Sequence, residues 1–109
     1  MGIAVAVAAR STCPRAAVGA VIVLGGKYIA ATGYNGSAPG MDHCADAGCL
    51  IATDHEGVEH CMRVIHAEQN AINTAARLGV AIKGATIYTT HTPCSRCASS
   101  IAAAGMTIA

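Results

Sequence analysis

The first third of the chain alternates short apolar runs with glycine and proline breaks. Residues 1–10 are rich in alanine and precede Pro14, which predicts a short helix. Residues 18–24 form a β-branched run, Gly25 and Gly26 form a turn sequence, and residues 27–32 are apolar again. This order is typical of a β-hairpin.

The last third alternates helical and extended patterns. Residues 66–78 have helical spacing with Gly79 as a cap, and residues 94–104 form a second helix that begins after Pro93. Residues 85–90 and 106–109 have the composition of strands. Helices before, between and after strands predict an α/β fold, a three-layer α/β/α sandwich with a mixed central sheet.

The stretch between these regions, from residue 33 to about residue 64, has no sustained period. It contains five glycines, three of the six cysteines and three of the five histidines. We therefore expect a long loop, which is unusual in a small domain unless it is functional or fastened by a ligand.

Composition narrows the possible functions. With 109 residues the chain suits one domain, but its apolar residues are mainly alanine, valine and isoleucine, with no Phe or Trp. Such a thin core favours support from a metal or from subunit partners. The net charge of +1 argues against binding long nucleic acid, while a small anionic substrate needs only one or two cations. No apolar run reaches the length of about 18 residues that a membrane span needs, and the apolar start lacks the basic residues of a signal peptide.

Six cysteines in a short chain indicate either a disulfide framework or metal binding. The aliphatic core, the five histidines and the lack of an export signal favour metal binding. Reduced cysteines in turn imply a cytoplasmic location.

The strongest chemical signal is His66-Ala67-Glu68, followed 28 residues later by Cys94-Ser95-Arg96-Cys97. One histidine and two thiolates hold a catalytic zinc and leave a fourth position for water. Glu68, which is not a ligand, would move protons while water attacks a ring carbon that carries an amine. Alone, the cysteine pair indicates a redox pair or half of a structural zinc site; together the two motifs indicate a zinc nucleobase deaminase.

Both motifs lie at predicted helix starts. Cys94 and Cys97 are three residues apart, so their thiols point to the same side of a helix. The positive end of the helix is expected to lower both thiol pKa values and favour the thiolates that zinc requires.

Further motifs extend over nearly the whole chain. They are residues 10–15 (RSTCPR), 18–23 (VGAVIV), 33–36 (GYNG), 43–44 (HC), 48–49 (GC), 60–63 (HCMR), 66–72 (HAEQNAI) and 90–94 (THTPC). With them the chain resembles the deoxycytidylate (dCMP) deaminases of the cytidine/deoxycytidylate deaminase superfamily, in particular their bacterial competence-operon branch.

The resemblance implies hydrolytic deamination of dCMP to dUMP, which supplies thymidylate synthesis. It assigns the catalytic zinc to His66, Cys94 and Cys97, and the proton transfers to Glu68. It also implies dCTP and dTTP as allosteric effectors and a homo-oligomer such as a hexamer.

Three residues are candidates for substrate binding. By resemblance Asn35, flanked by glycine, would bond the deoxyribose or the pyrimidine; the alternative is that Asn35-Gly36 is only a turn. Arg15 has the geometry to bind the substrate phosphate or is a solvated side chain. Asn70 lies one turn after His66 and either contacts the nucleotide or caps a loop.

A second cluster of cysteines and histidines lies mainly in the long loop. Some relatives carry a structural zinc there, which would order the loop. The proposed ligands are Cys13, Cys44, Cys49 and His60, with Cys61 in reserve. The alternative is free buried thiols beside exposed histidines.

The chain also departs from the family pattern. We expect a single deaminase domain over residues 1–109 that lacks the start of the family's first helix and its C-terminal strands. Thr92 stands where relatives commonly have an aromatic residue near the substrate base. The competing functions are another zinc deaminase, acting on a different cytosine, adenine or guanine substrate, and a zinc-stabilised module without catalysis.

Overall fold

The computed structural model describes residues 2–11, 17–36, 51–53, 57, 59–61 and 65–109. The helices within these residues are α1 (Gly2–Ala8), α3 (Ala67–Leu78) and α4 (Ser95–Ala103). Its strands are β1 (Gly19–Leu24), β2 (Tyr28–Tyr34), β3 (Ile51–Thr53), β4 (Glu59–Cys61), β5 (Thr86–Thr89) and β6 (Thr107–Ile108). Each helix and strand expected from the periodic parts of the sequence is confirmed.

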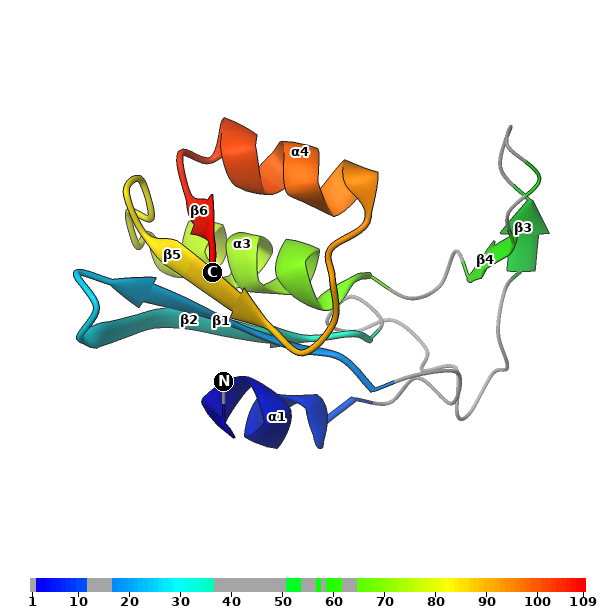
Figure 1. Ribbon diagram of the computed structural model, residues 1–109, viewed down its shortest axis with the longest axis horizontal. Coiled ribbons are helices and arrows are strands. Elements are labelled where there is room, and N and C mark those ends of the chain that lie inside the picture. Colours follow the sequence, from blue (N-terminus) through cyan, green and yellow to red (C-terminus); the bar gives the residue numbers. More distant parts are fainter. Residues whose placement is uncertain (1, 12–16, 37–50, 54–56, 58, 62–64) are drawn as a thin grey trace.

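The main sheet has the strand order β2-β1-β5-β6 (Figure 1). β1 pairs with both β2 and β5 in antiparallel fashion, whereas β5 and β6 are parallel. The sheet is therefore mixed, as expected. Because β5 and β6 are parallel, the chain between them must cross over the sheet, and α4 is that crossover helix.

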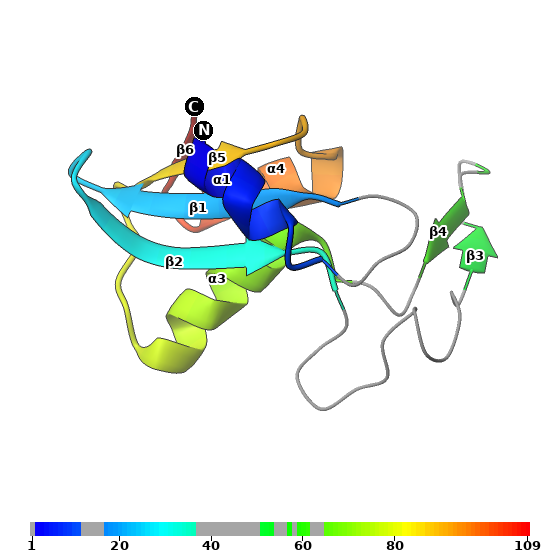
Figure 2. The same ribbon diagram turned by 90° about the horizontal axis from the view of Figure 1, so that it is seen from below.

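Helices cover the two faces of this sheet. α3 and α4 lie on one face and α1 lies on the other (Figure 1). Seen from below, α1 crosses over β1 and β2 (Figure 2). The three-layer α/β/α arrangement predicted from the sequence is confirmed.

Two glycines allow the helices to approach the sheet closely. A Cβ atom at Gly19 would lie 2.1 Å from the Ala4 carbonyl oxygen in α1, and one at Gly33 would lie 2.3 Å from the Ala67 carbonyl oxygen in α3. Both contacts involve backbone, which cannot move aside as a flexible side chain does. These two sheet positions, one under α1 and one under α3, therefore require glycine.

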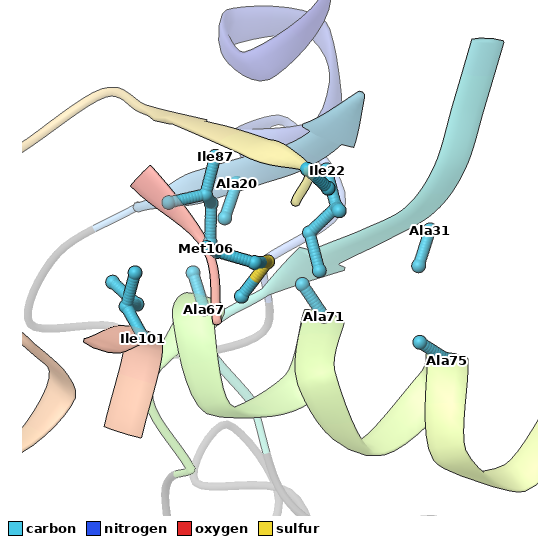
Figure 3. Close-up of a cluster of buried hydrophobic side chains, with 10 residues drawn as sticks. Ala20, Ile22, Ala31, Ala67, Ala71, Ala75, Ile87, Ile101 and Met106 are labelled. Carbon is cyan, nitrogen blue, oxygen red and sulfur yellow. The ribbon is translucent and has the colours of Figure 1, made fainter. Parts of the chain in front are cut away.

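The core lies between the sheet and α3 (Figure 3). From α3, Ala67, Ala71 and Ala75 repeat at intervals of four and face the sheet, as helical periodicity requires. Ile22 and Ile87 are the large buried side chains that the sheet contributes. The cluster also includes Ile101 from α4 and Met106, which lies just before β6.

The described part of residues 33–64 differs from the expected loop. β2 continues to Tyr34, two residues beyond its predicted end, because Gly33 and Tyr34 still pair with β1. β3 and β4 form a separate antiparallel hairpin in which Ala52 pairs with His60. The prediction of a structureless loop is therefore wrong for these residues, since three-residue strands are too short to display a period.

Among the described residues, no helix is both long and apolar enough to cross a membrane.

Candidate metal centre

The starts of α3 and α4 meet on one face of the sheet. His66 is the N-cap residue of α3 and Cys94 is the N-cap residue of α4. Each helix is preceded by extended backbone, with ψ angles of 152° at His66 and 167° at Cys94. The fold therefore brings the two sequence motifs together at the positive ends of two helices.

The three expected ligands form one cluster. Their ligand atoms all lie within 4.8 Å of one another. His66 Nδ1 is 3.5 Å from Cys94 Sγ and 3.3 Å from Cys97 Sγ. A tetrahedral zinc with ordinary bond lengths separates its nitrogen and sulfur ligands by about 3.5 Å. The donor set and its spacing therefore fit zinc bound through Nδ1 and two sulfurs.

The cluster is open on one side. Cys97 is buried, whereas His66 and Cys94 are exposed. Among the described residues, no other histidine, cysteine or carboxylate joins this group. Three protein ligands with an accessible side are the arrangement of a catalytic zinc site, because a structural site has four.

Cys94 also holds the start of its own helix. Its Sγ accepts a hydrogen bond from the Cys97 backbone N–H at 3.5 Å. This bond satisfies one of the free N–H groups at the helix start, a function that serine or aspartate usually has. The same atom is thus an N-cap acceptor and a candidate metal ligand.

The environment of Cys97 corrects one expectation. Burial raises the pKa of the Cys97 thiol above its ordinary value, and the charge of Glu68 beside it raises the pKa further. Hydrogen bonding to Cys94 acts in the same direction. The expected lowering by the helix end is therefore wrong for Cys97 in the protein without metal. A divalent cation would supply the positive charge that favours its thiolate.

Glu68 lies beside this cluster without joining it. It is in the first turn of α3 and only 4% exposed. Its interaction with Cys97 places the carboxyl group next to one sulfur. A buried carboxyl beside an open metal position has the location that a proton shuttle needs.

The GYNG segment is attached to the start of α3. Gly36 and Ile65 exchange two backbone hydrogen bonds, of 3.1 and 2.8 Å. Asn35, which is 7% exposed, accepts a bond from the Val18 N–H through Oδ1 at 2.9 Å. Asn35 is therefore adjacent in the chain to Gly36, which pairs with Ile65, the residue directly before His66. Its contact with a nucleotide stays a prediction.

The side chain of Asn70 fastens this segment to α3. Its Nδ2 group donates to the carbonyl oxygens of Tyr34 at 2.8 Å and Ile65 at 3.3 Å, with Gly36 farther away at 3.5 Å. These bonds correspond to the loop-holding alternative considered for Asn70. A contact between Asn70 and the nucleotide stays a prediction.

The remaining predicted residues are not brought into the cluster by any described contact. Arg15, Cys13, Cys44 and Cys49 lie outside the described residues. His60 is described only as a backbone position of β4, opposite Ala52. The second zinc site therefore stays a prediction.

The hydrogen bonds of Thr90, near the site, were not predicted from the sequence. Thr90 Oγ1 accepts a bond from the Gly19 N–H at 3.1 Å, and the Thr90 N–H donates to the Gly19 carbonyl at 3.0 Å. Thr90 Oγ1 also lies 2.9 Å from His91 Nδ1. Thr90 therefore fastens the loop before Cys94 to β1. Thr90 lies within the THTPC motif, but its pairing with Gly19 depends on the order of the strands in the sheet, which the sequence does not display.

Comparisons with known proteins agree with this site. Residues 1–108 match the family described as the cytidine and deoxycytidylate deaminase zinc-binding region. The chain is 54% identical to ComE operon protein 2 of Bacillus subtilis over 91% of its own length, but spans only 49% of that relative. It is 38% identical to the deoxycytidylate deaminase of Mycobacterium phage D29, covering 97% of this chain and 85% of that protein.

A solved structure has the same fold. The dCMP deaminase of cyanophage S-TIM5, in complex with dCMP and dUMP, superimposes with a TM-score of 0.78 at 35% identity. The match covers 96% of this chain and 71% of the cyanophage chain. On the family match, the relatives and the fold, this chain belongs to the cytidine and deoxycytidylate deaminase zinc-binding family.

Proposed function

We propose that this chain catalyses the zinc-dependent hydrolytic deamination of dCMP to dUMP and so supplies thymidylate synthesis. The observation that carries the proposal is the cluster of His66, Cys94 and Cys97 with the buried Glu68 beside it. Relatives named deoxycytidylate deaminase and the cyanophage enzyme that binds dCMP and dUMP support this choice of substrate.

His66, Cys94 and Cys97 would hold the zinc ion. When bound, zinc supplies a Lewis acid that lowers the pKa of water and so makes it a nucleophile. Glu68 would accept the two protons that the attacking water loses, one after the other, and would pass the first to the ring nitrogen and the second to the departing ammonia. Its burial next to Cys97 keeps the carboxyl group in place for both transfers.

Substrate binding is assigned to three residues outside the metal cluster. Asn35 bonds the deoxyribose or the pyrimidine, and its location beside the Gly36–Ile65 pair supports this role. Arg15 binds the phosphate, for which a guanidinium has suitable geometry. Asn70 acts here mainly through its bonds to the GYNG segment and contacts the nucleotide only secondarily.

The proposal includes further expectations from the family. A second, structural zinc is bound by Cys13, Cys44, Cys49 and His60, with Cys61 as the alternative ligand. dCTP and dTTP act as effectors on a cytoplasmic homo-oligomer such as a hexamer. Metal analysis of the purified chain tests the second site, since two zinc ions per chain support it and one contradicts it.

A substrate panel tests the proposed activity. Ammonia release is measured with dCMP, dCTP, deoxycytidine and a tRNA anticodon stem as substrates. We expect clear turnover of dCMP and much slower turnover of the others. Robust turnover of another substrate with none of dCMP would instead identify a different zinc deaminase.

A further inference from the structure

A hydrogen bond joins the two helices that carry the candidate metal ligands. Gln69 Nε2 in α3 donates to Ser100 Oγ in α4 at 2.8 Å, and the contact is partly buried. Neither residue belongs to the metal cluster. The bond therefore has no part in holding the metal directly, and its effect must come through the positions of the helices.

The bond repeats the geometry of the metal cluster one turn farther along. Gln69 follows His66 by three residues, and Ser100 follows Cys97 by three. Both pairs, His66–Cys97 and Gln69–Ser100, are separated by 31 positions in the sequence. Equal separation means that α3 and α4 run in the same direction. The Gln69–Ser100 bond lies about 4.5 Å along the helices from the metal pair.

Apolar packing alone fixes the position of α4 only weakly. α3 presents Ala67, Ala71 and Ala75 to the core, and these have no side chain beyond Cβ. Ile101 is the fully buried aliphatic side chain of α4. Apolar contact has no preferred direction, whereas a hydrogen bond requires defined distance and alignment. Apolar contact through Ile101 therefore limits rotation and sliding of α4 less sharply than a directional hydrogen bond does.

Gln69 is also used in an unusual way for its position. It is the third residue of α3, where a glutamine commonly reaches back to the N-cap backbone. The N-cap residue is His66, whose side chain makes no cap hydrogen bond and lies against the two sulfurs instead. Gln69 bonds the neighbouring helix rather than its own.

We propose that Gln69 and Ser100 are positioning residues that fix α4 against α3 and so hold Cys97 and Cys94 at ligand distance from His66. This inference rests on the proposed zinc function. The bond acts before metal binding, by limiting how far the three ligand atoms move apart.

The test uses zinc-loaded protein, four single variants around the hydrogen bond, the Gln69→Met/Ser100→Ala double variant and a Cys94→Ser reference. Gln69→Met keeps the side-chain length but removes the N–H donor, and Ser100→Ala removes the acceptor. Ser100→Thr keeps a hydroxyl group at this position and should therefore keep the hydrogen bond. Ser99→Ala is the matched control, because Ser99 is exposed on the same helix. The readouts are the rate of zinc transfer to a chelator and the absorption spectrum of the Co²⁺ form, with Cys94→Ser identifying the signal of this site.

We expect Gln69→Met and Ser100→Ala each to speed zinc transfer about tenfold, in the range found for residues that support metal ligands. Their Co²⁺ spectra should change alike, and the double variant should be no worse than either single one. Ser100→Thr and Ser99→Ala should match the unmodified protein.

Unchanged zinc transfer and Co²⁺ spectra in Gln69→Met and Ser100→Ala would overturn the inference, even if the variants melt at lower temperature. Altered metal readouts in a protein that never deaminates dCMP would preserve the inference and reject the proposed function. The two failures are therefore distinguishable.

Discussion

The Asn70 side-chain amide donates a hydrogen bond of 2.8 Å to the backbone carbonyl of Tyr34. This bond links α3, which carries Glu68 in its first turn, to the end of β2, where the GYNG segment lies. The same amide nitrogen also reaches the Ile65 carbonyl, directly before His66. One side chain thus fastens together the proposed metal and nucleotide sides of the site.

Replacing Asn70 should cost stability as well as activity. Asn70→Ala leaves partly buried carbonyl groups without their donor, so we expect the free energy of unfolding to fall by about 1–3 kcal/mol. Urea denaturation measures this change. Asn73→Ala is the control, since Asn73 is exposed on the same helix. A raised KM for dCMP with a denaturation midpoint equal to the control would show that Asn70 acts through the nucleotide instead.

Gly33 should not accept a side chain. In Gly33→Ala the new methyl group would lie 2.3 Å from the Ala67 carbonyl oxygen and 2.4 Å from the Ala71 nitrogen. Moving α3 away to relieve this contact would cost at least about 1–3 kcal/mol and would displace Glu68. We expect a lower melting temperature and weaker turnover. Gly2→Ala, where the added methyl group meets nothing within 4 Å, should melt like the unmodified protein. Equal melting temperatures for both variants would contradict the prediction.

Glu68→Gln separates metal binding from proton transfer. The amide has the shape of the carboxyl group but cannot carry protons, so we expect turnover to fall by about 10²–10⁴-fold. Because Glu68 is outside the group of candidate ligands, the zinc content should not change. Ammonia release and metal analysis are measured on the same preparation. Intact function in this variant would favour a zinc-stabilised module without catalysis.

The stability of the metal-free protein should fall as pH rises. The pKa of Cys97 is raised by burial and by the Glu68 charge, so the folded state holds this proton more tightly than the unfolded state. The resulting stabilisation is fully present below the unfolded thiol pKa of about 8.5 and declines above it. Denaturation of the reduced, metal-free protein at several pH values measures the decline. Zinc-loaded protein should behave oppositely, because zinc binds the thiolate.

Cys97→Ala is the control for this pH dependence. It lacks the titrating thiol, so its free energy of unfolding should vary less over the same range. Parallel curves for the two metal-free proteins would assign the pH dependence to other groups.

The sequence predicted the elements that carry the site better than the segment beside it. α3 has a regular apolar face that ends at Gly79, and α4 begins directly after Pro93. Both features are local, so the positions of His66 and Cys94 at helix starts followed from them. β3 and β4 have three residues each and depend on pairing with one another. Such short strands leave no periodic pattern in the sequence.

Contacts between distant elements account for most of what the sequence did not reveal. The pairing of Gln69 with Ser100 requires α3 and α4 to be parallel and in register. The direction of the Cys97 pKa shift likewise depends on burial and on the nearby Glu68, neither of which is local to the CxxC motif. The positive end of α4 favours a lower thiol pKa, but desolvation of the buried Cys97 thiol raises the pKa and has the larger effect.

The bond from the Cys97 N–H to the Cys94 sulfur is made by protein atoms alone. We therefore expect α4 to begin at Ser95 before an ion is bound, unlike small zinc domains that fold only around their metal. We infer that the ion exchanges in the folded protein, so dialysis against a chelator followed by another divalent metal should replace it without denaturant. Spectroscopic metals should then enter the folded protein by incubation, and protein that has lost its metal should regain it without being made anew.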